Sequence, residues 1–276
     1  MSKVALITGA TRGIGRALAL GLAKNGYNIV IAGKTSAPNP KLPGTIYSVA
    51  DEVREFDVKA LPVKVDLRDD KQIENLVKDT ERDFGKLDLL INNAGALFWR
   101  PVKDTELKNY DLINNINSRA SFYLSKLCIP LLENSGGGHI INQSPPLLEG
   151  KLFQEAVKDK TAYMISKWGM TIGAMGLAEE YRGKGIAVNS LWPMTPIESY
   201  ALINNNLGER KMWRNTNIIV DSVLEILKED RDTFTGHQLI DEMYLRSKGV
   251  EDFTKYQCIR GHEPPKLTDI NKMMRT

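Results

Sequence analysis

Short apolar runs rich in β-branched residues alternate along this chain with longer amphipathic stretches, and no other feature limits its possible folds so strongly. The runs that we interpret as buried strands are residues 4–7, 29–31, 60–65, 87–91, 139–141 and 186–188. The stretches with helical spacing of apolar side chains are residues 13–24, 47–55, 70–84 and 161–181. Strands that are apolar along nearly their whole length, separated by helices, are typical of a parallel sheet. We therefore predict an α/β fold with a doubly wound parallel sheet of about seven strands and helices on both faces.

No change in composition divides the 276 residues into two parts. Proline-bearing loops at 38–43 and 193–196 lie between elements of the same alternation. The pattern becomes less regular after Gly249, in a part that contains Pro264 and Pro265. We therefore expect a single domain over residues 1–276, with an irregular C-terminal extension from about residue 249.

Composition and charge exclude several classes of protein. Lysine and arginine number 37 against 34 aspartate and glutamate, and this small surplus is scattered, so we expect no nucleic-acid partner. The two cysteines, Cys128 and Cys258, form neither a disulfide framework nor a metal-ligand motif, so we expect no metal. The longest run without a charged side chain, residues 134–148, is broken by glycines and prolines, so we expect no membrane span. Because no address signal is readable, a cytoplasmic location is the default expectation.

A glycine-rich turn follows the first predicted strand and leads directly into the first predicted helix. Glycines let a pyrophosphate approach the backbone, and the free N–H groups and dipole of a helix N-terminus favour its negative charge. The spacing is G-x-x-x-G-x-G rather than G-x-G-x-x-G, and an ordinary turn is the alternative, but the position favours a dinucleotide. The residues expected to contact it are Gly9, Ala10, Thr11, Arg12, Gly13, Ile14 and Gly15.

The end of the second predicted strand indicates which dinucleotide is preferred. A carboxylate usually stands there when the ribose 2′-hydroxyl is free, but this chain has Lys34 and no acid. Lys34 and Arg12 can both pair with a 2′-phosphate, so we predict NADP(H) in preference to NAD(H). The alternative is that both are solvated surface charges.

Tyr163 and Lys167 are four positions apart, so they share one face of a predicted helix. A nearby ammonium favours the phenolate and lowers the tyrosine pKa, which suits proton exchange with a carbonyl oxygen. Tyr244 and Lys248 have the same spacing, so the pair alone does not identify a site. The first pair differs because it follows the glycine turn, Asn117 and Ser144 in the chain.

This ordered set resembles the short-chain dehydrogenase/reductase superfamily over nearly the whole chain, which implies a Rossmann-type fold. The resemblance implies that Tyr163 is the general acid/base and that Lys167 lowers its pKa and binds the nicotinamide ribose. It implies that Ser144 holds the substrate oxygen and that Asn117 steadies a proton-relay water. The further residues implied to line the cofactor cleft are Asp66 and Leu67 beside the adenine, and Asn93, Ala94 and Gly95.

A closer resemblance is to hydroxysteroid dehydrogenase-like proteins whose longer members also carry a sterol-carrier domain. The segments that carry it are 33–35, 40–47, 144–146, 191–193, 234–236, 240–242 and 261–262. The resemblance implies a peroxisomal or mitochondrial location as the alternative to the cytoplasmic default. Apolar loops at 145–148 and 191–203 favour a lipid-like substrate.

The chain also departs from the superfamily pattern near the predicted site. Met194 replaces the usual glycine, Pro196 offers no N–H, and prolines follow Ser144. The 19 positions from Ser144 to Tyr163 indicate an insertion. We expect an NADP(H)-dependent oxidoreductase that interconverts a small-molecule carbonyl and a secondary alcohol. The alternative is a catalytically impaired NADP(H)-binding protein with a regulatory or sensing role.

Glycines recur at helical spacing after Tyr163, at positions 169, 173 and 176, which indicates close helix packing. A second subunit is one partner for that face, and we expect a homodimer or homotetramer. An enzyme that modifies nucleotide sugars is a third interpretation of the whole chain, but the larger C-terminal substrate domain of such enzymes is missing.

Overall fold

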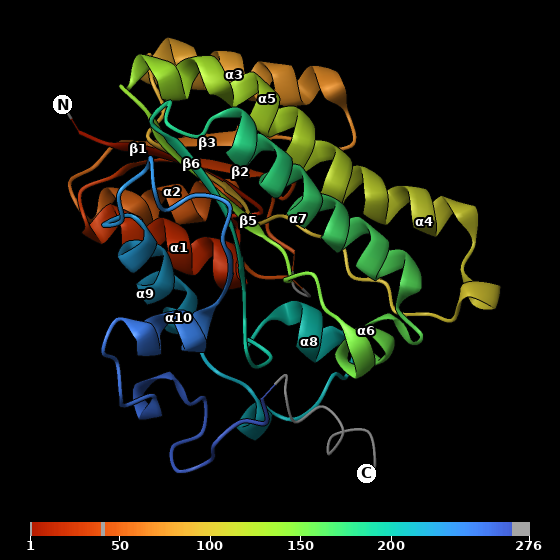
Figure 1. Cartoon of the computed structure of the whole chain (residues 1–276). Coiled ribbons are helices and arrows are strands. Elements are labelled where there is room, and N and C mark those ends of the chain that lie inside the picture. The colour runs from red at the N-terminus through yellow and green to blue at the C-terminus, as the bar shows by residue number, and fades with distance from the viewer. Residues whose placement is uncertain (1, 40–41, 267–276) are drawn as a thin grey trace.

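The computed structural model, which describes residues 2–39 and 42–266, contains a seven-stranded parallel sheet (Figure 1). The strand order is β3-β2-β1-β4-β5-β6-β7. The strands are β1 (Val4–Thr8), β2 (Asn28–Gly33), β3 (Ala60–Lys64), β4 (Leu89–Asn92), β5 (Gly138–Gln143), β6 (Ile186–Trp192) and β7 (Gln238–Ile240). The predicted doubly wound α/β fold is confirmed. Because the chain reverses its direction across the sheet between β1 and β4, a crevice for ligands is expected at the carboxyl ends of these strands.

Helices cover both faces of this sheet (Figure 1). One face carries α1 (Gly13–Lys24), α2 (Ile46–Arg54), α9 (Asn217–Ile226) and α10 (Asp241–Ser247). The other carries α3 (Asp70–Phe84), α4 (Leu107–Asn114), α5 (Ala120–Asn134) and α7 (Thr161–Glu180). Two short helices, α6 (Gly150–Val157) and α8 (Tyr200–Asn204), lie beyond the carboxyl ends of the strands.

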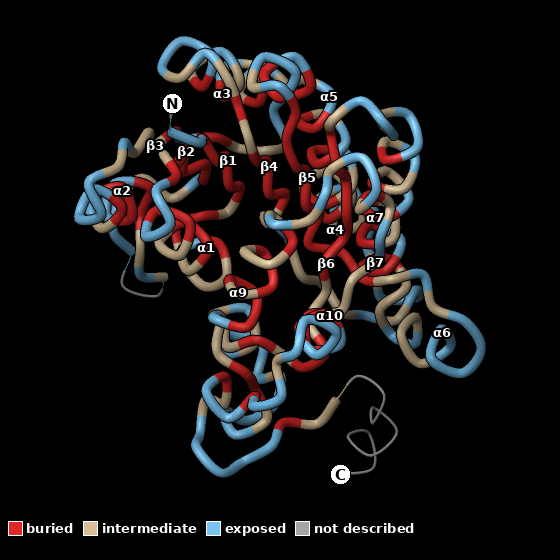
Figure 2. The backbone as a smooth tube through the Cα atoms, turned by 60° about the vertical axis from the view of Figure 1, so that its left-hand side comes forward, coloured by how far each residue is buried: buried red, intermediate tan, exposed pale blue. Residues whose placement is uncertain are grey.

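Each face of the sheet has its own apolar core. Leu18 and Leu22 of α1 pack with Ile218 of α9 on one face, and Leu76 of α3 packs with Leu124 of α5 on the other. Strands β1, β2, β4, β5 and β6 are almost wholly buried (Figure 2), which explains their near-continuous apolar sequences, whereas the edge strands β3 and β7 are only partly buried. No residue of α6 is buried, so this helix is held to the protein by one side only.

Local sequence signals explain where the helices begin and end. The Asp69 carboxylate accepts hydrogen bonds from the backbone N–H groups of Lys71 and Gln72 and so caps α3 at its start. Gly85 ends the same helix in a left-handed conformation, with φ of 69°. Thr45 and Ser48 form a capping box at the start of α2.

The fold differs from the expectation in several parts. Helices α4, α5, α8, α9 and α10 were not predicted, β7 is too short to give an apolar run, and the insertion before Tyr163 forms α6 instead of an open loop. Pro40 and Lys41, which belong to one of the segments carrying the closer resemblance, lie outside the described residues, as do residues 267–276.

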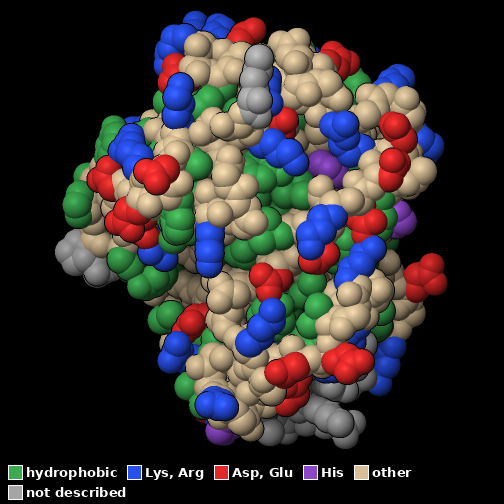
Figure 3. All heavy atoms as spheres, turned by 90° about the vertical axis from the view of Figure 1, so that its left-hand side faces the viewer, with side chains coloured by type: hydrophobic (Ala, Val, Ile, Leu, Met, Phe, Trp, Pro, Cys, Tyr) green, Lys and Arg blue, Asp and Glu red, His purple; other side chains and the backbone are tan. Residues whose placement is uncertain are grey.

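Charged side chains of both signs are interspersed on the face that Figure 3 shows. Among the described residues, no helix is both long and apolar enough to cross a membrane, and no group of three or more His, Cys, Asp or Glu side chains is arranged to hold a metal ion.

Candidate active site

The glycine turn is a close-packed loop between β1 and α1. Gly9 and Gly13 have φ angles of 67° and 52°, a region that favours glycine. A Cβ at Gly15 would lie 2.3 Å from the Gly9 carbonyl oxygen, so no larger residue fits there. A Cβ at Gly44 would lie 2.0 Å from the Thr11 carbonyl oxygen, so the loop before α2 packs directly on the turn. The backbone is therefore exposed at close range, as a pyrophosphate requires.

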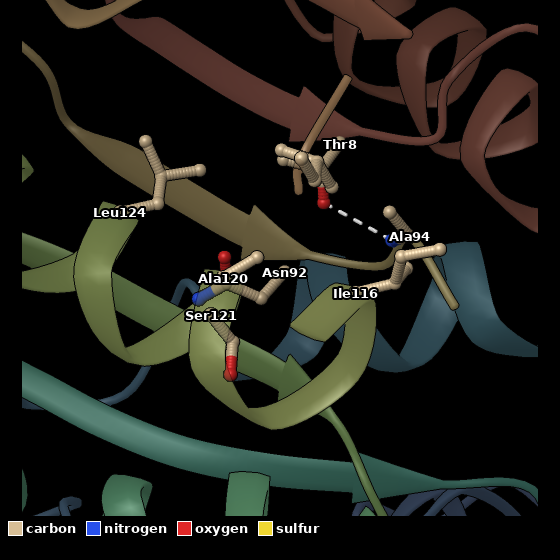
Figure 4. Close-up of a pocket in the computed structure, with 8 residues that line it drawn as sticks. Thr8, Asn92, Ala94, Ile116, Ala120, Ser121 and Leu124 are labelled. Carbon is tan, nitrogen blue, oxygen red and sulfur yellow. Dashed lines mark hydrogen bonds between the residues drawn. The ribbon is translucent and has the colours of Figure 1, made fainter. Parts of the chain in front are cut away.

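The segment after β4 is fastened to this turn. The Thr8 hydroxyl oxygen accepts hydrogen bonds from the backbone N–H groups of Asn93 (3.1 Å) and Ala94 (3.0 Å). The Asn93 side-chain amide donates to the Thr8 carbonyl oxygen at 2.8 Å. Thr8 and Ala94, which are far apart in the sequence, thus lie together at the predicted crevice, and Figure 4 shows the contact between them.

A narrow hollow opens beside these residues (Figure 4). Its lining includes Leu67, Ala94 and Ile116, and the remaining residues are Thr8, Asn92, Ala120, Ser121 and Leu124. Leu67 and Ala94 were predicted to line the cofactor cleft. The hollow is too small in this structure to admit a water molecule, and the polar side chains of Thr8, Asn92 and Ser121 line it together with the apolar ones.

Charged side chains gather near the end of β2. Arg12 donates to the Thr35 hydroxyl at 2.6 Å, and its Nε atom is buried without a hydrogen-bond partner among the described residues. Lys34 is 2.9 Å from a carboxylate oxygen of Asp66, which also pairs with Arg68. The hydrogen bonds from Arg68, and then that from Lys34, hold the pKa of Asp66 well below its ordinary value. Sequence reasoning missed Arg68, because nothing in its spacing relates it to Lys34.

Asn117 lies in a π-helical turn, Asn115–Arg119, between α4 and α5. Its side chain accepts a hydrogen bond from the Ala96 N–H (2.8 Å) and donates to the Ala96 carbonyl oxygen (3.1 Å) and the Ser166 hydroxyl (2.9 Å). Single π turns interrupt helices mainly at functional sites. The turn holds the fully buried Asn117 side chain between the segment after β4 and helix α7.

Lys167 is buried on α7, with its ammonium group directed at the end of β5. It donates to the Gln143 carbonyl oxygen and lies 5.4 Å from the Trp192 ring centre. A Cβ at Gly95 would lie 3.8 Å from Lys167 Nζ and 3.5 Å from Asn117 Oδ1, so these three predicted residues meet. Burial lowers the pKa of Lys167 to about 7.

Tyr163 lies one turn earlier on the same helix and is 9% exposed. The Trp99 ring meets it edge to face, with 6.3 Å between ring centres. Burial raises the pKa of Tyr163 above its ordinary value, which is opposite to the predicted effect of Lys167. Burial is the cause of this shift, and among the described residues the Lys167 amine donates to Gln143 and not to the Tyr163 hydroxyl.

Ser144 is fully buried behind this pair. Its hydroxyl oxygen lies 2.9 Å from that of Thr171, and the Thr171 hydroxyl also donates to the Pro145 carbonyl oxygen at 2.7 Å. In the described part of the chain no hydrogen bond joins Ser144 to Tyr163. The predicted contact of Ser144 with a substrate oxygen therefore stays a prediction.

The second tyrosine and lysine pair is explained by an ion pair. The Tyr244 hydroxyl donates to Glu229 at 2.8 Å, and Lys248 pairs with the same carboxylate. Both side chains thus have a structural partner on the opposite side of the sheet from α7. Equal spacing in sequence produced two different environments.

Comparison with known proteins identifies the family. The short chain dehydrogenase family model matches residues 3–200. This chain belongs to that family. It is 44% identical over 265 residues to Hydroxysteroid dehydrogenase-like protein 2 from Mus musculus, covering 96% of this chain and 53% of that protein. It is 45% identical over 267 residues to the protein of the same name from Danio rerio, covering 96% and 62%. The short-chain dehydrogenase therefore spans between about half and three-fifths of these curated relatives.

Solved structures agree with this family and fold. A short chain dehydrogenase from Mycobacterium thermoresistibile superposes with a TM-score of 0.87 at 36% identity, covering 95% of this chain and 92% of that one. A metagenomic short-chain oxidoreductase in complex with NADP superposes with a TM-score of 0.70 at 25% identity, covering 86% and 96%.

Proposed function

We propose that this short-chain dehydrogenase is an NADP(H)-dependent oxidoreductase that interconverts a carbonyl and a secondary alcohol. The observation that carries the proposal is the meeting of Gly95, Asn117 and Lys167, one helical turn from Tyr163, at the carboxyl ends of the strands. Tyr163 and Lys167 would transfer protons beside the segment that is fastened to the glycine turn.

The residues of the turn fit a dinucleotide. Glycines at positions 9, 13 and 15 leave the backbone open, and the buried Nε atom of Arg12 lacks a partner among the described residues. Arg12 and Lys34 would hold a 2′-phosphate, while Leu67 would pack on the adenine. When bound, the cofactor supplies or accepts the hydride. The proposed preference for NADP(H) depends on these two cations and on the lack of an acid at the end of β2.

Tyr163 would exchange the proton with the substrate oxygen. Its raised pKa keeps the phenol protonated near neutral pH, as reduction of a carbonyl requires. Lys167 has a pKa of about 7 and can carry or release a proton at the same pH. Asn117 would hold the segment around Ala96 in place beside them.

The apolar side chains that the insertion before Tyr163 exposes favour a lipid-like or bulky apolar substrate. Phe153 of α6 stacks on Trp168 with 5.1 Å between ring centres, and the Trp168 indole donates to the Pro146 carbonyl oxygen. Leu147 and Phe153 remain 49% and 43% exposed. The insertion between Ser144 and Tyr163 thus adds an apolar rim.

One observation favours a second function, that of an NADP(H)-binding protein without turnover. The Ser144 hydroxyl is fully buried and accepts a hydrogen bond from the Thr171 hydroxyl, so a substrate oxygen would have to reach a buried group. The residues proposed to bind the cofactor would still bind it, whereas Ser144 would contribute less to catalysis.

A homodimer or homotetramer is the proposed assembly. Phe122 of α5 and Ile165 and Ile172 of α7 are exposed on neighbouring helices, although they are apolar. Gly169 packs within the chain, since a Cβ there would lie 2.8 Å from the Ser118 Cβ, whereas Gly173 and Gly176 have open space. The surface around the last two glycines can accept a second subunit.

The test is a titration of the purified protein with NADPH and NADH, followed by tryptophan fluorescence, and then a screen of carbonyl and alcohol substrates. Tyr163→Phe should bind NADPH as the wild type does and lose at least about a thousandfold in turnover. Tyr244→Phe is the matched control and should keep wild-type turnover. Tight NADPH binding with no turnover by the wild type would favour the second function, and failure to bind either cofactor would refute both.

A further inference from the structure

Three segments far apart in the sequence pair like short strands next to the candidate site. The Arg214 N–H donates to the Pro196 carbonyl oxygen (3.0 Å), and the Glu198 N–H donates to the Arg214 carbonyl oxygen (2.9 Å). On the other side, the Asn215 N–H donates to the Tyr256 carbonyl oxygen at 2.7 Å. The loop after β6 is therefore tied, through residues 213–215, to the C-terminal extension.

Arg214 is the centre of this arrangement and is fully buried. Its guanidinium group pairs with Glu242 at 2.8 Å and with Glu263 at 2.6 Å, and it donates to the Phe253 carbonyl oxygen at 3.1 Å. Glu242 is buried, whereas the Glu263 side chain is 52% exposed. A buried guanidinium needs such partners, because its desolvation is costly. The extension supplies two of the three.

The same loop is held at a second point. The Asp241 carboxylate, at the start of α10, accepts hydrogen bonds from the backbone N–H groups of Met194 (2.7 Å) and Glu242 (2.6 Å). Two neighbouring residues of α10 therefore hold the loop after β6. Asp241 bonds to it directly, and Glu242 acts through Arg214.

This loop reaches the glycine turn. A Cβ at Gly13 would lie 3.8 Å from the Ser199 Cβ, so the residue that starts α8 packs against the cofactor turn. Residues 199–212, which include α8, form a flap whose two ends are joined by the pairing of 196–198 with Arg214. Ser199 directly follows the paired residues 196–198, so a shift of that pairing would move Ser199 relative to Gly13.

We propose that residues 250–266 form a clamp on the cofactor site, and that Arg214 is a positioning residue through which the clamp fixes the loop after β6 against the glycine turn. This inference rests on the proposed cofactor site, but not on the identity of the substrate. The C-terminal extension then contributes to cofactor binding, although it does not contact the cofactor. Loosening the clamp should weaken cofactor binding without removing any residue that contacts the cofactor.

Glu263→Gln is the sharpest variant, because it removes the negative charge of the exposed partner of Arg214 and leaves the buried Glu242 pair. Glu251→Gln, an exposed change in the same extension, is the matched control. We expect Glu263→Gln to raise amide hydrogen exchange at Glu198, Arg214 and Asn215 roughly tenfold, with no change in β1 or β4. The control should leave exchange unchanged.

Cofactor binding gives a second readout. Glu263→Gln should raise the NADPH Kd, and the KM for NADPH, between about threefold and tenfold with little change in kcat. Arg214→Lys, which keeps the charge beside Glu242, should show a larger effect of the same kind. Wild-type exchange and Kd in Glu263→Gln, or exchange raised evenly over the whole sheet, would overturn the clamp. If the wild type binds no NADPH, the proposed function fails, while the exchange experiment still decides whether the clamp exists.

Discussion

The hydroxyl oxygens of Ser144 and Thr171 lie 2.9 Å apart in a fully buried position, and this pairing limits what Ser144 can contribute to chemistry. A hydroxyl that leaves one hydrogen bond to form another gains only the difference between them, on the order of 1 kcal/mol. We therefore expect Ser144→Ala to lower kcat/KM by roughly tenfold or less, far less than Tyr163→Phe does. Steady-state kinetics of the two variants with one substrate checks this.

Thr171→Val is the control for this prediction. It removes the other half of the pair and leaves the Ser144 hydroxyl in place, so it should cost stability without a loss of kcat. A hundredfold loss of kcat/KM in Ser144→Ala alone would contradict the prediction and give Ser144 the full role that the family resemblance implies.

Lys167 should make stability depend on pH in a defined window. Burial lowers its pKa from an ordinary value of 10.5 to about 7 in the folded protein. Between these two values the unfolded chain binds more protons than the folded one, so the free energy of unfolding rises with pH from about 7 to about 10. The slope attributable to Lys167 approaches about 1.4 kcal/mol per pH unit.

Urea unfolding of the wild type and of Lys167→Met at several pH values between about 6 and 9.5 measures this slope. The other titrating groups are common to both proteins and cancel in the difference. We expect the stability of Lys167→Met relative to the wild type to fall as pH rises. A difference that is independent of pH would show that Lys167 is not buried as the structure has it.

Local patterns in the sequence were enough to predict the first six strands, the glycine turn and the Tyr163–Lys167 pair. Each depends on residues that are close in the chain, where spacing determines which side chains share a face. The pairing of Ser144 with Thr171 and that of Arg214 with Glu242 join residues 27 and 28 positions apart, and no local pattern specifies them. Tertiary packing alone decides these contacts.

The reversed pKa shift of Tyr163 has a similar cause. Sequence spacing placed an ammonium beside the phenol, but it did not show that both groups are buried or that Gln143 accepts the lysine hydrogen bond. The contact of Trp99 with Tyr163 was also not predicted, because an aromatic residue near a strand end is equally consistent with ordinary core packing. Burial has to be known before the sign of an electrostatic effect can be predicted.

Lys34→Asp should reverse the cofactor preference. The lysine is exposed and pairs with Asp66, so a bound 2′-phosphate can compete for it, whereas an aspartate would repel the phosphate and accept a bond from a free 2′-hydroxyl. We expect the NADPH Kd to rise at least about tenfold while the NADH Kd stays level or falls. Fluorescence titration at low salt measures both.

The matched control for Lys34 is Lys59→Asp, an exposed lysine at the opposite end of the sheet edge. It makes the same change in net charge, so it reports the long-range electrostatic effect alone. Equal losses of NADPH affinity in both variants would remove Lys34 from the cofactor site. A wild-type preference for NADH would show that the missing acid at the end of β2 was misinterpreted.

Ile172→Glu should dissociate the proposed assembly. Ile172 is 61% exposed on α7, Phe122 is 66% exposed on the neighbouring α5, and Gly173 and Gly176 of α7 have open space beside them. Burying a glutamate between two subunits leaves an unpaired charge, which costs several kcal/mol and shifts a micromolar association toward monomer. Sedimentation velocity should show a mass of at least twice 30.9 kDa for the wild type and a monomer for the variant.

Met243→Glu, an equally exposed change on α10 across the sheet, is the control and should sediment as the wild type does. A monomeric wild type, or an Ile172→Glu protein that remains associated, would place the interface elsewhere or remove it.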